Sequence, residues 1–274
     1  MSLDQLPPLR ESLAEHGLLA KKSFGQHFLL DLNVTRKIAR LAGPLDGATV
    51  IEVGPGPGGL TRALLEAGAR VIAVEKDARF LPLLQELADA SGKLTVVEAD
   101  ALQVDEAALS GGQAHVVSNL PYNVGTPLLI KWLTEPWQAL SMTLMFQKEV
   151  ADRIAARPGS SAYGRLAVIS QAVARAQVVM DLPARAFTPP PKVASAVVRL
   201  DPLPHRPSAA ELAALERVTA AAFGQRRKML RSSLRALGGE ALCDGAGIDP
   251  NARAEVVDIA GFLQLARTSL SSSS

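Results

Sequence analysis

The stretch Asn119-Leu120-Pro121-Tyr122 combines residue types that can act together on a flat ring carrying an amine. The β-branched pair Val116-Val117 precedes it, and a turn-forming segment at 123–127 follows, which predicts a strand that ends in a tight turn before a helix. Open α/β sheets bind ligands at the carboxyl ends of their strands. At such an end, the Asn supplies a hydrogen-bond acceptor, the Pro a fixed bend and the Tyr a stacking face. A plain Pro-containing turn is the alternative, and these four residues alone do not decide between the two.

A glycine-rich segment at 54–58 follows a short apolar run at 48–53. Its glycines allow the backbone to turn sharply and to approach a ligand closely, at the point where a helix begins. The next apolar strand ends in Glu75, which is placed to accept hydrogen bonds from ribose hydroxyls, and the third strand is followed by Asp100. Either acid could be an ordinary polar residue at a strand end. In combination, they predict a ligand that carries a nucleoside.

The spacing of the glycines distinguishes two classes of nucleoside ligand. Dinucleotide enzymes favour Gly-x-Gly-x-x-Gly, which places a pyrophosphate at the helix N-terminus. Here Gly54, Gly56 and Gly58 form Gly-x-Gly-x-Gly, with Glu52 two residues before the first glycine. This spacing resembles that of S-adenosylmethionine methyltransferases, whose ligand has no pyrophosphate. A nicotinamide-dependent dehydrogenase fits the loop less well and leaves the motif at 119–122 unexplained.

Short apolar strands alternating with helices must position these motifs. The pattern predicts strands at 48–53, 70–74, 94–97, 114–118, 141–146, 177–180 and 194–200. We therefore expect an α/β fold that ends in helices only, beyond a proline-rich linker at 201–208. The resemblance to methyltransferases implies, in addition, a Rossmann-like methyltransferase sheet with a small all-helical C-terminal domain. The expected domains are 1–204, with 1–40 as an N-terminal arm and helices, and 205–268, followed by a disordered Ser-rich tail at 269–274.

Charge is divided unevenly along the chain. Residues 41–140 hold 6 Lys/Arg against 12 Asp/Glu, whereas residues 141–235 hold 15 against 6. The basic half suits a polyanion. Beyond the linker, Arg227, Arg231 and Arg235 recur at i, i+4 and i+8, with Arg226 and Lys228 nearby, which predicts a basic stripe on one helix. A solvated charged face is the alternative, but five cations within 226–235 and no acid among them favour contact with phosphates.

The composition argues against several other classes of protein. The single cysteine, Cys243, allows neither an internal disulfide nor a cysteine-cluster metal site, and the four histidines are scattered. Residues 1–20 carry acids and prolines that do not fit a signal peptide. No apolar run reaches the roughly 18 residues of a membrane span. We therefore expect a soluble cytoplasmic protein without a metal.

Several motifs in combination resemble those of the ribosomal RNA adenine dimethyltransferases, and most closely the branch that acts on the bacterial small subunit. The resemblance runs from about Lys21 to Ile259. The matching motifs are Phe24-Gly25-Gln26, Glu52-Val53-Gly54-Pro55-Gly56, Asn119-Leu120-Pro121-Tyr122, Gln147-Lys148-Glu149-Val150, Tyr163-Gly164-Arg165-Leu166, Phe187-Thr188-Pro189-Pro190-Pro191-Lys192 and Phe223-Gly224-Gln225-Arg226-Arg227-Lys228.

The resemblance implies roles for individual residues. The S-adenosyl-L-methionine contacts that it implies, together with Gly56 of the glycine loop, are His27, Leu29, Gly54, Glu75, Asp100 and Asn119. Family members commonly have Asn where this chain has His27, but an imidazole can still donate to the cofactor's carboxylate. The basic residues expected to contact RNA are Lys21, Lys22, Arg226, Arg227, Lys228, Arg231 and Arg235.

The catalytic residues implied by the same resemblance are Asn119, Leu120, Pro121, Tyr122 and Phe187. The Asn119 side chain and the Leu120 carbonyl would accept hydrogen bonds from adenine N6, and Tyr122 and Phe187 would sandwich the flipped base. Three prolines stiffen the loop that carries Phe187, although this ring could instead plug the core beneath the loop.

The implied activity is dimethylation of N6 on two adjacent adenosines in the 3′-terminal hairpin of 16S rRNA. The implied partner is an immature small ribosomal subunit, and we expect a monomer. A 23S rRNA methyltransferase of the antibiotic-resistance type shares these motif types and remains an alternative. So does an assembly factor whose chemistry is secondary. A DNA methyltransferase would need a target-recognition domain, for which the segment after the linker leaves little room.

Overall fold

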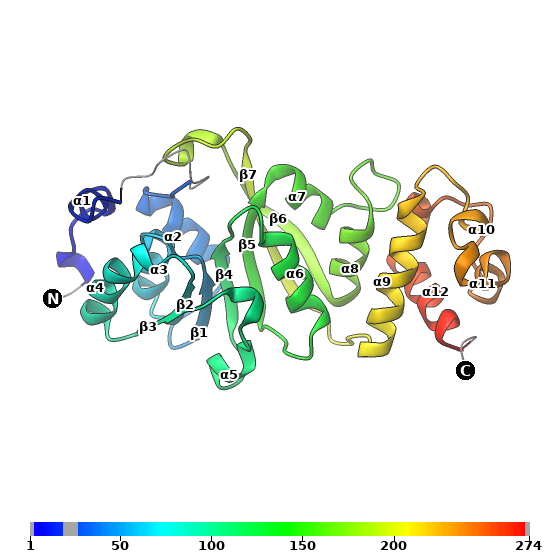
Figure 1. Cartoon of the computed structure of the whole chain (residues 1–274), viewed down its shortest axis with the longest axis horizontal. Coiled ribbons are helices and arrows are strands. Elements are labelled where there is room, and N and C mark those ends of the chain that lie inside the picture. The colour runs from blue at the N-terminus through cyan, green and yellow to red at the C-terminus, as the bar shows by residue number, and fades with distance from the viewer. Residues whose placement is uncertain (1–2, 19–26, 272–274) are drawn as a thin grey trace. The chain divides into compact units, whose positions relative to one another are not determined.

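The computed structural model describes residues 3–18 and 27–271 of the chain. Seven strands form one sheet in the order β3-β2-β1-β4-β5-β7-β6 (Figure 1). The strands are β1 (Thr49–Val53), β2 (Arg70–Glu75), β3 (Leu94–Glu98), β4 (His115–Asn119), β5 (Ser141–Gln147), β6 (Ala174–Leu182) and β7 (Ser195–Pro202). Strands β1 to β5 pair in parallel, and β7 runs antiparallel to β5. The expected α/β methyltransferase sheet is confirmed, and each predicted strand is present.

Helices alternate with the strands in the first part of the chain, as the alternating pattern of the sequence predicts. Their bounds are α1 (Leu9–Glu15), α2 (Leu32–Leu41), α3 (Gly59–Glu66), α4 (Leu81–Ser91), α5 (Glu106–Ser110), α6 (Gly125–Thr134), α7 (Lys148–Ile154) and α8 (Arg165–Val173). The Asp31 side chain caps α2 by accepting from the Asn33 N–H. No helix in the described part of the chain has the length and apolar character needed to cross a membrane.

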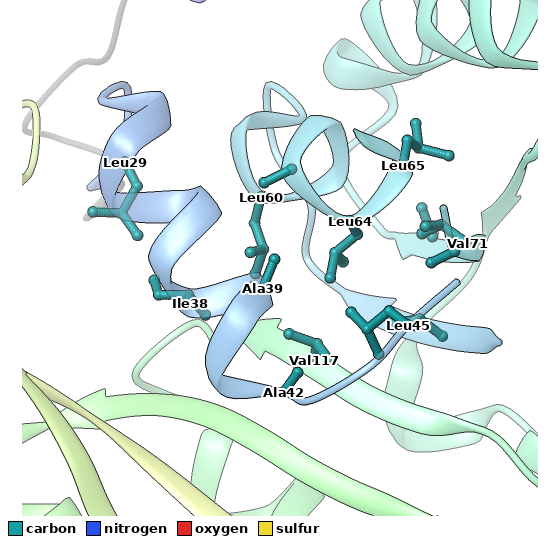
Figure 2. Packing of buried hydrophobic residues seen from close by; sticks show 14 of the residues in the cluster. Leu29, Ile38, Ala39, Ala42, Leu45, Leu60, Leu64, Leu65, Val71 and Val117 are labelled. Atoms are coloured by element: carbon teal, nitrogen blue, oxygen red, sulfur yellow. The ribbon is translucent and has the colours of Figure 1, made fainter. Parts of the chain in front are cut away.

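Buried aliphatic side chains join the helices to the sheet around the start of the glycine loop. Figure 2 shows Ala39 of α2 and Leu60 and Leu64 of α3 packed in the same layer as Val71 of β2 and Val117 of β4. The inner positions of β1 and β4 are all buried, as expected for parallel strands covered on both faces. This core holds rigid the strand ends that carry the candidate motifs.

The chain divides into two compact units. The first comprises the residues to Leu129, with Trp137–Ala151 and Val178–Leu200. The second comprises Ile130–Pro136, Asp152–Gln177 and the chain from Asp201 onward. The chain passes for the last time from the first unit to the second after Leu200, and the segments 130–136 and 152–177 also belong to the second unit.

The second unit ends in helices α9 (Ala209–Gly224), α10 (Leu230–Ser233), α11 (Gly239–Gly245) and α12 (Ile259–Ser271). Helix α9 begins with a capping box, in which Ser208 and Glu211 each accept from the other's backbone N–H. Tyr163 is fully buried here, and its hydroxyl donates to the Val257 carbonyl at 2.9 Å. Helix α12 continues to Ser271, past the residue at which we expected the tail to begin.

Candidate functional site

A pocket of about 900 Å³ opens at the carboxyl ends of β1, β2 and β4, and all its lining residues belong to the first unit. Its size suits a nucleoside-bearing ligand together with a second planar group. Ten of the residues expected to bind cofactor or base line it together: His27, Leu29, Gly54, Gly56, Glu75, Asn119, Leu120, Pro121, Tyr122 and Phe187. The structure therefore gathers side chains from five separate stretches of sequence into one site.

The glycine loop and the Asn-Leu-Pro-Tyr motif touch each other. Gly54 has a φ of +65°, and a Cβ placed on it would lie 3.2 Å from the Pro121 ring. Ser118, one residue before the motif, donates from its hydroxyl to the Val53 carbonyl at 2.5 Å. Because only glycine tolerates both this backbone conformation and this approach, Gly54 sets the spacing between the loop and the motif.

Glu75 lies at the end of β2 with 7% of its surface exposed, and it is hydrogen-bonded to the glycine loop. One carboxylate oxygen accepts from the Gly56 N–H at 3.0 Å, and the other from the Asp77 N–H at 2.8 Å. Burial raises the pKa of Glu75, and these backbone donors oppose that shift. Each oxygen retains a further lone pair, so the carboxylate can also accept from the hydroxyls of a ligand.

Asp100 is the expected cofactor residue that does not line the pocket. Its carboxylate pairs with Lys76 at 2.8 Å and accepts from the Leu102 N–H at 3.0 Å. These contacts lower the pKa of Asp100, chiefly through the Lys76 ammonium. Lys76 itself lines the pocket, so the ion pair links Asp100 to the pocket wall.

Tyr122 and Phe187 are both held in place at the pocket. The Tyr122 hydroxyl lies 2.9 Å from the buried Ser195 hydroxyl of β7. Phe187 is 3% exposed and belongs to the main apolar core while also lining the pocket. The two roles considered for Phe187, a face for the ligand and a plug for the core, are therefore compatible.

His27 binds the loop that follows Phe187. Its Nδ1 lies 2.7 Å from the Pro189 carbonyl and must be the donor, because a carbonyl only accepts. Phe28 and Thr188 exchange two backbone hydrogen bonds, each 2.9 Å long. The His27 and Tyr122 ring centroids are 6.1 Å apart. His27 thus joins the N-terminal segment to the side of the pocket that carries Tyr122 and Phe187, and its Nε2 is the ring nitrogen left to meet a ligand.

The basic residues of the second unit do not form a stripe on one helix, and this prediction is wrong. Helix α9 ends at Gly224, and the chain turns before α10 begins at Leu230. Backbone pairing accounts for the break, since the Leu230 N–H donates to the Ala252 carbonyl and the Arg231 N–H to the Pro250 carbonyl. The i, i+4 spacing therefore arises without a continuous helix.

The same residues nevertheless remain cationic and exposed, with one exception. Arg227, Lys228, Arg231 and Arg235 are exposed, and we call these four the basic set. Arg226 instead donates to the Glu255 carboxylate at 3.0 Å and to the Ser161 carbonyl at 3.0 Å, so its guanidinium serves the unit's own structure. Lys21 and Lys22 lie outside the described residues.

The pocket also contains residues for which the motifs predicted no role. Glu52, Phe28, Lys76 and Phe80 line the pocket, and the Phe28 and Phe80 rings meet edge to face at 5.6 Å. Phe28 lies between His27 and Leu29, for both of which the resemblance implies a cofactor contact, whereas no motif includes Phe80. Arg253, exposed and paired through its backbone with Met229, adds a cation beside the basic set.

Comparison with known proteins places the chain among enzymes that modify RNA. Residues 17–269 match the family model described as "Ribosomal RNA adenine dimethylase". The chain is 75% identical over 267 residues to "Ribosomal RNA small subunit methyltransferase A" of Phenylobacterium zucineum, covering 97% of this chain and 94% of that protein.

Two solved structures share the fold over nearly their whole length. A dimethyladenosine transferase from Plasmodium falciparum superposes with a TM-score of 0.73 at 25% identity, covering 87% of this chain and 96% of that one. The 23S rRNA methyltransferase ErmE superposes with a TM-score of 0.69 at 27% identity, covering 88% and 98%.

Proposed function

The chain belongs to the ribosomal RNA adenine dimethylase family, and from this premise we propose that it dimethylates N6 of two adjacent adenosines near the 3′ end of 16S rRNA. It is an S-adenosylmethionine-dependent rRNA adenine dimethyltransferase of the small subunit. We further propose that the protein acts as a monomer in the cytoplasm on an immature small subunit, and that the residues named below bind the cofactor, the base and the RNA.

The pocket suits S-adenosylmethionine, which when bound supplies a methyl group activated by a sulfonium. The glycine loop leaves no Cβ at Gly54 or Gly56, so backbone can lie against the cofactor. Glu75 would accept from the ribose hydroxyls while still holding Gly56. His27 and Leu29 would contact the cofactor from the N-terminal segment. Asp100 would act at the outer edge, where Lys76 holds its carboxylate.

The Asn-Leu-Pro-Tyr motif would hold the adenine. Adenine N6 is a poor nucleophile because its lone pair is delocalised into the ring. The Asn119 side chain and the Leu120 carbonyl would accept its two N–H bonds, which draws electron density onto nitrogen and aims it at the methyl. No strong base is needed, because the N–H proton becomes acidic as the new N–C bond forms. The same chemistry calls for no metal.

Stacking would supply the affinity for the flipped base. Tyr122 and Phe187 would contribute roughly 1–3 kcal/mol for each base–aromatic contact. Pro121 fixes the bend that presents Tyr122, and the hydrogen bond with Ser195 limits rotation of its ring. Lys21, Lys22 and the basic set would neutralise phosphates of the surrounding RNA.

The observation that carries the proposal is the meeting of the Asn119–Tyr122 motif with the glycine loop and Glu75 in one pocket. The second candidate, modification of 23S rRNA, draws on the likeness to ErmE, which shares 27% of its residues with this chain. The 75% identity to a protein named for the small subunit favours the first.

A competition assay would decide between the two candidates. Unmethylated small and large subunits are mixed with the protein and labelled S-adenosylmethionine, and label is measured on each RNA. We expect label on the small-subunit RNA. Label confined to the large-subunit RNA would replace the proposal with the second candidate, and binding to small subunits without label would favour an assembly factor.

A further inference from the structure

Gly125 begins helix α6 three residues after the Asn-Leu-Pro-Tyr motif, and it is buried in the first unit. Its φ lies outside the left-handed region, so its backbone conformation does not require a glycine. The space around it does. A Cβ placed on Gly125 would lie 3.2 Å from Cε1 of Phe146 and 3.4 Å from the Leu120 Cβ. Carbon atoms in contact lie about 3.5–4.0 Å apart, so even one methyl group would crowd these neighbours.

Phe146 lies beside the motif in the neighbouring strand. In the pairing of β4 with β5, Asn119 lies opposite Met145, so Phe146 comes level with the residue that follows Asn119. On its other side, β5 pairs with β7, where Phe146 lies opposite Ala196. The Phe146 side chain is 4% exposed. Because β5 is held on both sides and the interior is closely packed, the ring has little room to withdraw from a group added at position 125.

Leu120, by contrast, has the pocket on one side of it. It follows the last residue of β4 and contributes to the pocket lining. The N–H groups of Val124 and Gly125 both donate to the Pro121 carbonyl, at 3.1 Å and 3.0 Å, so the start of α6 is hydrogen-bonded to the residue after Leu120. Crowding at position 125 would therefore be relieved by movement of Leu120 towards the pocket, since Phe146 cannot withdraw.

We propose that the Phe146 ring, packed into the space that Gly125 leaves, positions Leu120 so that its carbonyl meets adenine N6. This inference rests on the proposed function, in which that carbonyl accepts one N–H of the amine. Phe146 is not among the pocket-lining residues, so it acts through Leu120 and is a positioning residue. A misplacement of 1 Å can cost about 100-fold in rate, so a shift of a few tenths of an ångström should cost about tenfold.

The first test is Gly125→Ala, which adds the crowding methyl group. Single-turnover methylation of unmethylated small subunits by saturating protein gives the rate, and calorimetry gives the affinity for S-adenosylhomocysteine. We expect the rate to fall about tenfold because the acceptor for the amine is displaced. The affinity for S-adenosylhomocysteine should not change, because this probe makes no use of that acceptor. A rate equal to that of the unmodified protein would overturn the inference.

The second test is rescue by Phe146→Leu, which removes the ring atoms that approach Gly125. Alone, this change should lower the rate by less than Gly125→Ala does, because it leaves Leu120 free to shift without forcing it away. In the double variant, the rate should recover most of what Gly125→Ala loses, since residues in contact couple by roughly 2- to 150-fold. A double variant as slow as Gly125→Ala would overturn the inference, because the methyl group would not be acting against the ring.

A stability control separates positioning from a general loss of packing. Val71→Ala shortens a buried side chain of β2 outside the pocket. It should lower the midpoint of thermal unfolding and leave the rate unchanged, because it does not touch the motif. If Val71→Ala slows methylation as much as Gly125→Ala does, the rate follows overall stability, and the inference is overturned.

The design keeps the two proposals separate. If Gly125→Ala fails to fold, as judged by circular dichroism, Phe146→Leu and Phe146→Ala decide the question, because both leave Gly125 in place. Their rates should fall in that order without loss of affinity for S-adenosylhomocysteine, and rates equal to that of the unmodified protein would overturn the inference. If the unmodified protein does not methylate small subunits, the proposed function fails and the inference with it. If it does and Gly125→Ala is equally fast, only the role of Phe146 fails.

Discussion

The two units of the chain use their polar side chains in opposite ways. In the first unit, pocket residues are mostly buried or half-buried, and several are held by hydrogen bonds: Glu75 binds Gly56, Tyr122 binds Ser195, and His27 binds the loop after Phe187. In the second unit, the basic set is exposed, and the one arginine of that run that is tied down, Arg226, serves the fold. We infer that the exact placement of side chains determines function in the first unit, whereas net charge determines it in the second.

This difference leads to different expected responses to mutation. A preorganised pocket loses catalysis steeply when one group is removed, because the remaining groups cannot move to compensate. An exposed cationic surface loses affinity gradually and in a salt-dependent way, since each charge contributes independently. The predictions that follow test this contrast, from the largest expected effect to the smallest.

Asn119→Ala should lower the rate of methyl transfer by about 10²–10³-fold, because one acceptor for the adenine amine is lost at the reacting atom. The fold should persist, since Asn119 ends β4 and is only half-buried. Single-turnover kinetics with saturating protein give the rate. A rate near that of the unmodified protein would remove Asn119 from the mechanism.

Tyr122→Ala should lower kcat/KM for the RNA by roughly 5- to 150-fold, which corresponds to the 1–3 kcal/mol of one stacked base. Tyr122→Phe is the matched control: it keeps the ring and loses only the bond to Ser195. We expect its kcat/KM to fall far less. Equal losses in the two variants would mean that the hydroxyl, and not the ring face, is what matters.

Glu75→Ala should weaken S-adenosylhomocysteine binding by about 1.5–3 kcal/mol, because the ribose loses a charge-assisted acceptor. The glycine loop also loses the hydrogen bond at Gly56. Glu75→Gln keeps one acceptor oxygen, so we expect it to lose less affinity. Calorimetry measures both. Unchanged affinity in the alanine variant would contradict the assignment of Glu75.

Replacing Arg227, Arg231 and Arg235 together by Gln should flatten the plot of log affinity for the small subunit against log salt. Three lost phosphate contacts correspond to a change in slope of roughly two to three. Cofactor affinity should not change, because the pocket lies wholly within the first unit. An unaltered slope would show these arginines to be solvated charges only.

Arg226→Gln is the counterpart within the same run and should leave that slope unchanged. It removes the pair with Glu255 and the bond to the Ser161 carbonyl, at a site where the Arg226 side chain is 40% exposed. Because solvent screens such a pair, we expect a loss of unfolding free energy below about 1 kcal/mol. A thermal melt detects the loss, and a flattened salt slope would place Arg226 among the RNA contacts.

The pocket could be predicted from the sequence because its chemistry is local to strand ends. Gly54, Glu75 and Asn119 each follow a short apolar strand, and parallel pairing brings such ends to one edge of the sheet. Phe80 was missed because its place depends on packing against Phe28, which no local pattern records. Asp100, which the resemblance implies as a cofactor contact, is not among the lining residues, and it is linked to them through its ion pair with Lys76.

The second unit was less predictable for a related reason. Periodic arginines suggested one helix, yet distant backbone at 250–253 pairs with residues 229–231 and breaks it. The segments 130–136 and 152–177 also belong to this unit. No change in composition marks their ends in the sequence. Surfaces assembled from distant parts of the chain are not encoded in the spacing of any one segment.

Nucleotide mapping of the methylated product tests the central claim most directly. Unmethylated small subunits are incubated with the protein and S-adenosylmethionine, and their RNA is digested and analysed by mass spectrometry. We expect N6,N6-dimethyladenosine at two adjacent positions in the 3′-terminal hairpin of 16S rRNA, and at neither position with Asn119→Ala. Modification at a single unrelated site, or none despite tight binding of subunit and cofactor, would contradict the account.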